Sequence, residues 1–283
     1  MGQASSRWRR LVTRRMEELE RLQPGRSPLA DPDFWNRRAR RFATTGPLRS
    51  AEQDPLLPRL RRAVTPGATL LDVGSGHGRF TLALAPRVRS AVALDPSRRM
   101  LAILRRTAKE AGARNVRTVV GKWPDAEGEV EVADVVVCAH VLPLIPDAKP
   151  FLAALDARAR RRVFVYMGTF ASDTVVDPFW RHFHGRPRRP PPTYLDAVGV
   201  LAELGIEPEV EVVEVPVRAR HATLDDAVKN YLDTLALPNT APVRRELGRL
   251  LEPWLQRSGD GSLRPPLRTQ PNAILSWRPS PAG

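Results

Sequence analysis

Leu70-Leu71-Asp72-Val73-Gly74-Ser75-Gly76-His77-Gly78-Arg79-Phe80 is the stretch that decides the fold of this 283-residue chain. Its first four residues are mostly apolar and predict a buried strand, and glycine then occupies every second position. Glycine permits tight turns and lets a ligand approach the main chain closely. The helix expected from Arg79 would begin with unpaired N–H groups and the positive end of its dipole. Together these features predict a ligand-binding loop at the carboxyl edge of a parallel sheet.

The spacing of the glycines separates two classes of ligand. Dinucleotide sites usually read G-x-G-x-x-G, so that a pyrophosphate meets the helix start, whereas Gly74, Gly76 and Gly78 read G-x-G-x-G. Asp72 lies two residues before the first glycine. A carboxylate there suits S-adenosylmethionine (SAM), which carries an ammonium and a sulfonium but no phosphate. We therefore expect Asp72, Ser75 and the three glycines to bind SAM.

A second acid lies where the next strand ends. The apolar run 91–94 leads into Asp95, 17 positions beyond Gly78. A carboxylate at this place can accept hydrogen bonds from both ribose hydroxyls of a nucleoside. Pro96 then precedes a helix, on which we expect Met100 to pack near the adenine.

Strands and helices alternate outward from this stretch, which indicates a parallel sheet covered on both faces. The expected strands are residues 69–73, 91–94, 116–120, 132–138, 163–167, 210–217 and 273–277. The expected helices are residues 6–22, a helix from 31 that carries Trp35, Ala39 and Phe42, and residues 52–64, 79–84, 97–111, 148–158, 194–204, 224–235 and 243–256. The predicted fold class is α/β, with a Rossmann-like seven-stranded, mostly parallel sheet, an N-terminal helical extension and a helical insertion before the last strand.

Four regions follow from this pattern. Residues 1–55 form a basic N-terminal helical extension or lid, 56–222 the SAM-binding core, 223–262 the helical insertion, and 263–283 the last core strand and tail. Residues 168–192 break the alternation and end in a proline-rich run. Loops of this length are uncommon inside compact domains and are usually functional or mobile. We expect a long loop here, over the carboxyl edge of the sheet.

Residues 69–140 resemble a class I SAM-dependent methyltransferase. Asp72–Gly78 matches the first motif of that family, and Asp95 matches its ribose-binding acid. The resemblance extends in order over roughly residues 30–220 and is specific only around the glycines and Asp95. It implies an enzyme that transfers a methyl group from SAM.

Two further motifs of the family match less closely. In the family, the loop after the third strand often offers an acid to the adenine amino group. Lys122 stands there and cannot accept that hydrogen bond, which leaves backbone atoms, Trp123 or Asp125 for the adenine. The fourth-strand motif ends in Ala139 and His140, which the resemblance places beside the methyl group.

Methyl transfer from a sulfonium is an in-line displacement, so the enzyme mainly aligns the acceptor and excludes water. The sequence fixes no catalytic residue. His140 is the candidate catalytic residue. An equally weighted alternative is that His140 only makes a structural hydrogen bond to a loop carbonyl. Tyr166, His182 and His184 are candidate acceptor contacts, although a packed or solvated loop accounts better for the two loop histidines. A His-x-His pair alone is weak support for a metal, and we expect none.

The formal net charge is +14, and residues 1–49 hold 12 Arg against 5 acidic residues, a net of +7. Because of this basic arm, an RNA methyltransferase is an alternative hypothesis for the function. The scatter of the other arginines and the lack of an aromatic-basic motif favour a small-molecule acceptor. A non-catalytic SAM-binding protein is a third hypothesis. The single cysteine, Cys138, fits a reducing compartment, and no apolar run approaches the ~18 residues of a membrane span. We therefore expect a cytoplasmic protein, of unknown oligomeric state.

Overall fold

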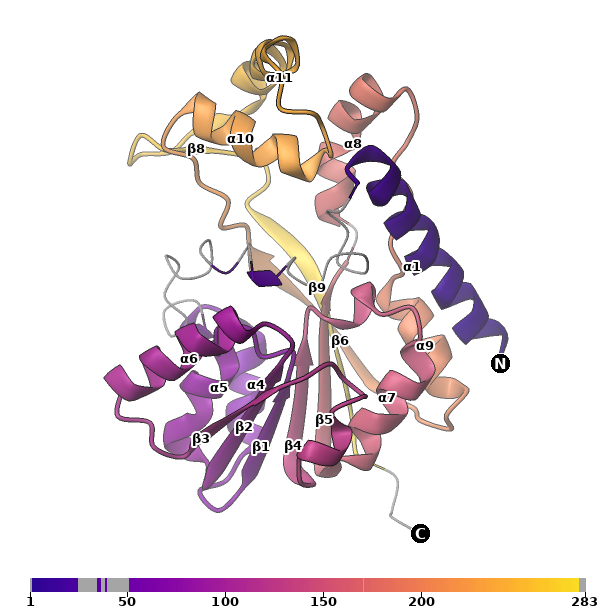
Figure 1. Cartoon of the computed structure of the whole chain (residues 1–283), viewed down its shortest axis with the longest axis vertical. Helices are drawn as coiled ribbons and strands as arrows, with labels where there is room; N and C mark the ends of the chain where they lie inside the picture. Colours follow the sequence, from indigo (N-terminus) through magenta and orange to yellow (C-terminus); the bar gives the residue numbers. More distant parts are fainter. Residues whose placement is uncertain (1, 25–34, 37–38, 40–50, 170, 280–283) are drawn as a thin grey trace.

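A seven-stranded sheet forms the centre of the molecule (Figure 1). The computed structural model describes residues 2–24, 35–36, 39, 51–169 and 171–279, apart from the side chains of 171–174. The strands of the sheet are β1 (Thr69–Val73), β2 (Ser90–Asp95), β3 (Val116–Val120), β4 (Ala133–Ala139), β5 (Ala159–Gly168), β6 (Glu209–Pro216) and β9 (Thr269–Trp277). Their order is β3-β2-β1-β4-β5-β9-β6. Strands β1 to β5 pair in parallel, and β9 is antiparallel to both of its neighbours. The predicted α/β fold class is confirmed.

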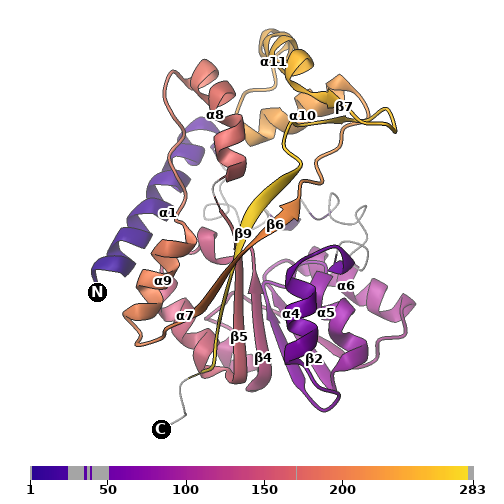
Figure 2. The same cartoon turned by 180° about the vertical axis from the view of Figure 1, so that it is seen from behind.

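Helices cover both faces of this sheet because successive residues of a strand point to opposite sides. On one face lie α4 (Leu56–Ala63), α5 (Arg79–Leu84) and α6 (Arg98–Glu110), and on the other α7 (Ala148–Ala157) and α9 (Tyr194–Ala202) (Figures 1 and 2). Leu70 belongs to the apolar cluster under α4 and α5, whereas Leu71 belongs to the cluster under α7 and α9. The short 3₁₀ helices are Ala85–Arg87, Glu127–Glu129 and Leu142–Leu144.

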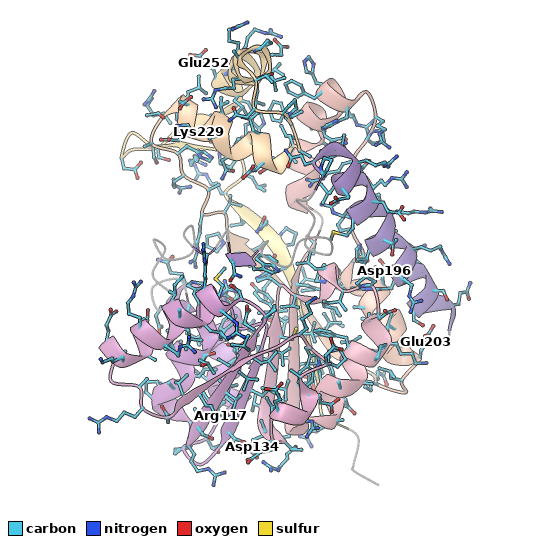
Figure 3. All side chains as sticks on the ribbon, in the orientation of Figure 1. Arg117, Asp134, Asp196, Glu203, Lys229 and Glu252 are labelled. Atoms are coloured by element: carbon cyan, nitrogen blue, oxygen red, sulfur yellow. The ribbon has the colours of Figure 1, made fainter. Side chains whose placement is uncertain are left out.

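The sheet has two edges of different kinds. The glycine loop follows β1 at the carboxyl edge. Asp134, in the second position of β4, lies at the opposite edge, at the bottom of Figure 3. The N–H of Thr69, where β1 begins, donates to Asp134 Oδ2 at 2.8 Å. Ligand-binding loops and strand starts are therefore separated by the length of the strands.

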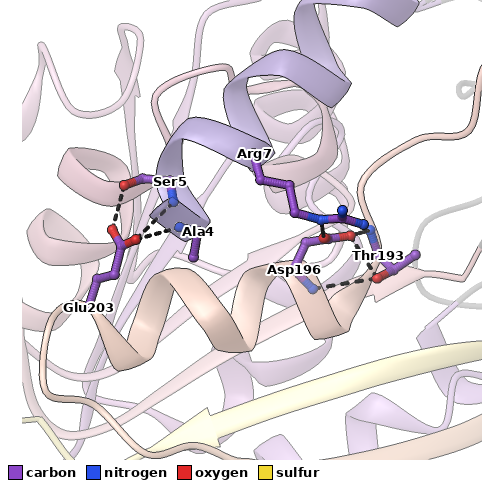
Figure 4. A network of polar contacts seen from close by, with 6 residues as sticks. All are labelled: Ala4, Ser5, Arg7, Thr193, Asp196 and Glu203. Atoms are coloured by element: carbon purple, nitrogen blue, oxygen red, sulfur yellow. Dashed lines mark hydrogen bonds and ion pairs between the residues drawn. The ribbon is translucent and has the colours of Figure 1, made fainter. Parts of the chain in front are cut away.

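Helix α1 (Gln3–Leu22) packs along α7 and α9. Trp8 and Val12 are fully buried, and Trp8 Nε1 donates to Ile145 O at 2.7 Å. Arg7 Nε lies 2.7 Å from Asp196 Oδ1 of α9 (Figure 4). The helix predicted near residues 6–22 is confirmed, and this described part of the basic arm is docked on the fold.

A second helical unit lies beyond the carboxyl edge, at the top of Figure 1. It contains α8 (Ala171–His184), α10 (Leu224–Thr234), α11 (Ala241–Trp254) and the hairpin of β7 (Gln256–Arg257) and β8 (Leu263–Arg264). The expected loop over 168–192 is therefore wrong for its first part, which is α8. Val176, Phe179 and Trp180 have helical spacing and pack against α10 and α11, a periodicity that the proline-rich end of the segment obscured.

The remaining elements agree with the predictions to within a few residues. The helix expected over 52–64 begins as α4 only after Pro55. Of the helix expected from residue 31, Trp35, Asn36 and Ala39 are helical, and Phe42 lies outside the described residues. Among the described helices, none is both long enough and apolar enough to cross a bilayer.

Candidate functional site

The loop between β1 and α5 has the backbone conformation that its glycines allow. Gly74, Gly76 and Gly78 have φ angles of +70°, +55° and +87°, a region that residues with a Cβ adopt at a cost. The N–H groups of Gly74 and Ser75 donate to Leu94 O at 2.8 and 3.1 Å, which joins the loop to the end of β2. A Cβ added at Gly76 would meet no atom within 4 Å. The main chain at Gly76 is therefore open to a ligand.

Asp95 faces this loop from the end of β2. Its Oδ2 accepts a hydrogen bond from Gly76 N at 2.9 Å, and its Oδ1 accepts one from Ser97 N at 2.8 Å. Only 7% of Asp95 is exposed, and this burial raises the pKa of its carboxyl, although the two backbone bonds act against the shift. The structure thus brings together the two motifs that the sequence singled out separately.

Asp72 lies beneath the loop. Its Oδ2 accepts from Thr81 Oγ1 at 2.6 Å and from Thr81 N at 3.2 Å, so the carboxylate holds the first turn of α5. Asp72 is 2% exposed, and burial raises the pKa of its carboxyl from 3.8 to about 6. The acid has a structural role that the sequence did not suggest. A contact with the cationic end of a ligand stays a prediction.

The residues at the start of α6 lie next to Asp95, beside the glycine loop. Ser97 Oγ accepts from Met100 N at 3.1 Å and donates to Asn36 Oδ1 at 2.7 Å. Met100 is buried and Pro96 is exposed. Asn36 was missed in the sequence because nothing near it pointed to a contact 61 residues away.

The loop after β3 differs from the expectation for Trp123. Trp123 is 7% exposed, belongs to the core cluster on the α7 face, and donates from Nε1 to Phe151 O at 3.2 Å. Its indole is therefore committed to the core and is a poor candidate for the adenine contact. Lys122 and Asp125 are both exposed, and Asp125 is the acid that this loop presents to solvent.

His140 follows β4 at the carboxyl edge, directly after the half-buried Ala139. It has a φ of +61°, its N–H donates to Tyr166 O at 2.7 Å, and its ring lies 4.7 Å from the Tyr166 ring. His140 is exposed to water. Desolvation, followed by the Arg79 cation, lowers the pKa of its imidazole, so the ring is mostly neutral at neutral pH.

A buried polar cluster lies next to His140, and the sequence did not predict it. Arg79 Nη1 is 3.0 Å from Asp54 Oδ2, and Asp54 is 2% exposed. Burial raises the pKa of Tyr166, and the nearby Asp54 carboxylate adds to that shift. Tyr166 and Asn272 are each 1% exposed. The cluster joins the turn before α4 with α5, β5 and β9, which are distant in sequence. The sequence pointed to Tyr166 as a candidate acceptor contact and to Arg79 only through the neighbouring glycine motif.

His182 and His184 lie on α8, in the upper helical unit. His182 Nε2 is 3.0 Å from Glu246 Oε1, and His184 Nε2 is 2.8 Å from Leu235 O. Both histidines join α8 to neighbouring helices of that unit, and a role toward an acceptor has no support from these contacts. Within the described parts of the chain, no three His, Cys, Asp or Glu side chains gather as a metal-binding set.

Known proteins share this architecture. Residues 70–161 match a family model described as a methyltransferase domain. The YcgJ protein of Bacillus subtilis has a solved structure that superimposes with a TM-score of 0.54 at 15% identity, over 80% of this chain and 98% of that one. At this identity the likeness concerns the fold.

Two curated relatives match parts of the sequence. An uncharacterized protein of Haemophilus influenzae is 30% identical over 148 residues, which is 51% of this chain and 53% of that protein. A ubiquinone biosynthesis O-methyltransferase of Hahella chejuensis is 32% identical over 110 residues, 38% of this chain and 45% of the relative. The chain therefore spans about half the length of the curated relatives that it matches.

Proposed function

The chain carries a methyltransferase domain of the class I SAM-dependent family, and from this premise we propose that it transfers the methyl group of SAM to a small-molecule acceptor. The observation that carries the proposal is the 2.9 Å hydrogen bond from Gly76 N to Asp95 Oδ2. It joins the two groups that would hold neighbouring parts of one adenosyl ligand. When bound, SAM supplies an electrophilic methyl group on a sulfonium.

The residues of the loop fit such a ligand. Each oxygen of Asp95 accepts one backbone N–H and retains a lone pair, so the carboxylate can accept two ribose hydroxyls. Ser75 Oγ is buried and has no hydrogen-bond partner in the described part of the chain. Asp72 places a negative charge below the loop, where it would favour the ligand's ammonium group.

His140 follows β4 at the carboxyl edge of the sheet. Desolvation and the Arg79 cation lower its pKa, and a general base works best when its pKa is near the working pH. We therefore expect His140 to position the acceptor rather than to remove a proton from it.

The position of the upper helical unit favours a small molecule. The helices α8, α10 and α11 lie beyond the same sheet edge as the glycine loop (Figure 1). Accessory elements at this place commonly determine the substrate, whereas the core of the fold is shared by many activities. Exclusion of water and alignment of the acceptor are what an in-line methyl transfer needs.

The RNA alternative loses support from the N-terminal helix. Arg7 and Arg9 form ion pairs with Asp196 and Asp147, so part of the arm's charge is neutralised inside the molecule. A non-catalytic SAM-binding protein would share the loop and differ only in turnover. Release of S-adenosylhomocysteine, measured with a metabolite extract and separately with total RNA, distinguishes the three hypotheses.

The binding part of the proposal is tested with two glycine variants. Gly76→Ala and Gly112→Ala both add a Cβ at positive φ, +55° and +67°, and neither Cβ meets an atom within 4 Å. We expect both to lose about 1 kcal/mol of unfolding free energy from backbone strain. Only Gly76→Ala should weaken SAM binding in calorimetry, by about tenfold or more, because its Cβ would occupy space that the ligand needs. Equal SAM affinities of the two variants would refute the site.

A further inference from the structure

A groove of about 910 Å³ lies among α4, the first residues of β5, the start of β6 and the end of β9. Its charged lining consists of two glutamates, Glu209 and Glu211, and six arginines: Arg59, Arg62, Arg160, Arg161, Arg162 and Arg278. These residues define what we call the arginine groove. Because β5 and β6 begin here and β9 ends here, the groove is near the edge of the sheet opposite the glycine loop.

Two of the six arginines are neutralised by the groove's own acids. Arg59 Nε lies 2.7 Å from Glu211 Oε2, and Arg162 forms an ion pair with Glu209. Arg162 also donates to Ser276 Oγ at 3.0 Å. These bonds fix both guanidinium groups against the strands, which makes them a rigid part of the groove wall.

The positive charges of the other four arginines are not paired with an acid. Arg62, Arg160, Arg161 and Arg278 are exposed, and none of them has an ion pair within 4.0 Å among the described residues. Six arginines against two glutamates leave the lining with a net charge of +4. Asp134 is a counter-charge for Arg160 and Arg161, which help to lower its pKa, but it is not within ion-pair distance of either, and its Oδ2 accepts hydrogen bonds from Thr69 N and Thr69 Oγ1.

Four like charges around one groove repel one another, and an anion in the groove would remove that cost. Arginine suits phosphate in particular, because its planar fork can donate two parallel hydrogen bonds to one phosphate group. The volume is also that of a small-ligand site.

We propose that the arginine groove binds a compact anion that carries two or more phosphate groups. A single-stranded nucleic acid fits less well. The aromatic side chain of the groove, Phe164, is 5% exposed and offers no face on which a base could stack. The position at the edge opposite Gly76 and Asp95 also separates this ligand from the methyl acceptor.

Calorimetry with inorganic pyrophosphate on the full chain tests the proposal. The variant is Arg160→Gln/Arg161→Gln. The matched control is Arg10→Gln/Arg14→Gln, which removes two charges from exposed positions of α1. We expect saturable binding to the unaltered protein, at least tenfold weaker binding to the groove variant, and less than a twofold change in the control. Because all four side chains are exposed, both variants should keep the thermal midpoint of the unaltered chain.

Three results would overturn the proposal. They are no saturable pyrophosphate binding, an equal loss in the control (which would make net charge the cause), and binding of a 12-nucleotide RNA that the groove variant loses and pyrophosphate does not displace. Titration of SAM into the same samples separates this test from the proposed function. The groove variant should bind SAM as the unaltered protein does, whatever it does with pyrophosphate.

Discussion

The two edges of the central sheet differ in charge and in burial. The carboxyl edge holds two acids, Asp72 and Asp95, that are 2% and 7% exposed. The opposite edge holds exposed arginines, with Arg160 and Arg161 at the start of β5. Buried acids have lost their hydration, and burial raises the pKa of each. Exposed arginines keep their hydration. The difference suggests that one edge recognises its ligand by fitted hydrogen bonds and the other by charge.

The largest expected effect is on SAM binding at the carboxyl edge. Asp95→Ala removes the acceptor of both ribose hydroxyls, and charged hydrogen bonds of this kind contribute about 1.5–3 kcal/mol each. We expect SAM affinity to fall on the order of 100-fold in calorimetry, while pyrophosphate binding stays unchanged. An Asp95→Ala protein that loses both ligands together would show that the two edges are not independent.

The second largest expected effect is that salt weakens ligand binding at the two edges to different extents. Raising NaCl from 50 to 500 mM shortens the screening length to a few ångströms and weakens interactions between exposed charges more than those in buried sites. We predict that pyrophosphate affinity falls about tenfold over this range, whereas SAM affinity changes about twofold or less. Parallel slopes for both ligands would contradict the comparison.

A smaller effect concerns the stability of the fold. The pKa of Asp72 is raised to about 6 in the folded protein, so the folded state binds its proton more tightly than the unfolded state does. Ionised Asp72 therefore destabilises the fold, and this cost grows as pH rises from 4 to 6. Asp72→Asn should raise the unfolding free energy by on the order of 1 kcal/mol at pH 7, with no gain at pH 4. It should also weaken SAM binding several-fold. Denaturant unfolding at both pH values measures the first effect, and a loss of stability at pH 7 would mean that the Thr81 contacts need the charge.

The glycine edge could be predicted from the sequence because one continuous segment builds most of it. The strand, the loop and the first turn of α5 occupy residues 69–84, and β1 and α5 have the predicted bounds. Asp95 was found because it ends the next strand along the chain. The bond between Asp95 and Gly76 depends on the parallel pairing of β1 and β2, which the fold class implies.

The remaining features could be recognised only in the three-dimensional fold. The arginine groove combines α4 with the starts of β5 and β6 and the end of β9, and in an arginine-rich sequence no local pattern marks those particular arginines. The cluster of Asp54, Tyr166 and Asn272 likewise comes from three distant elements. A loop position does not show that the Trp123 indole turns inward to Phe151. Helix α8 was missed although Val176, Phe179 and Trp180 gave it the right period.

A crystal structure of the protein with S-adenosylhomocysteine tests the central claim most directly. We predict that both ribose hydroxyls donate to the Asp95 carboxylate and that the ligand lies against the main chain at Gly76. A complex with the nucleoside bound elsewhere, or with Asp95 bonded only to Gly76 N and Ser97 N as it is now, would contradict it.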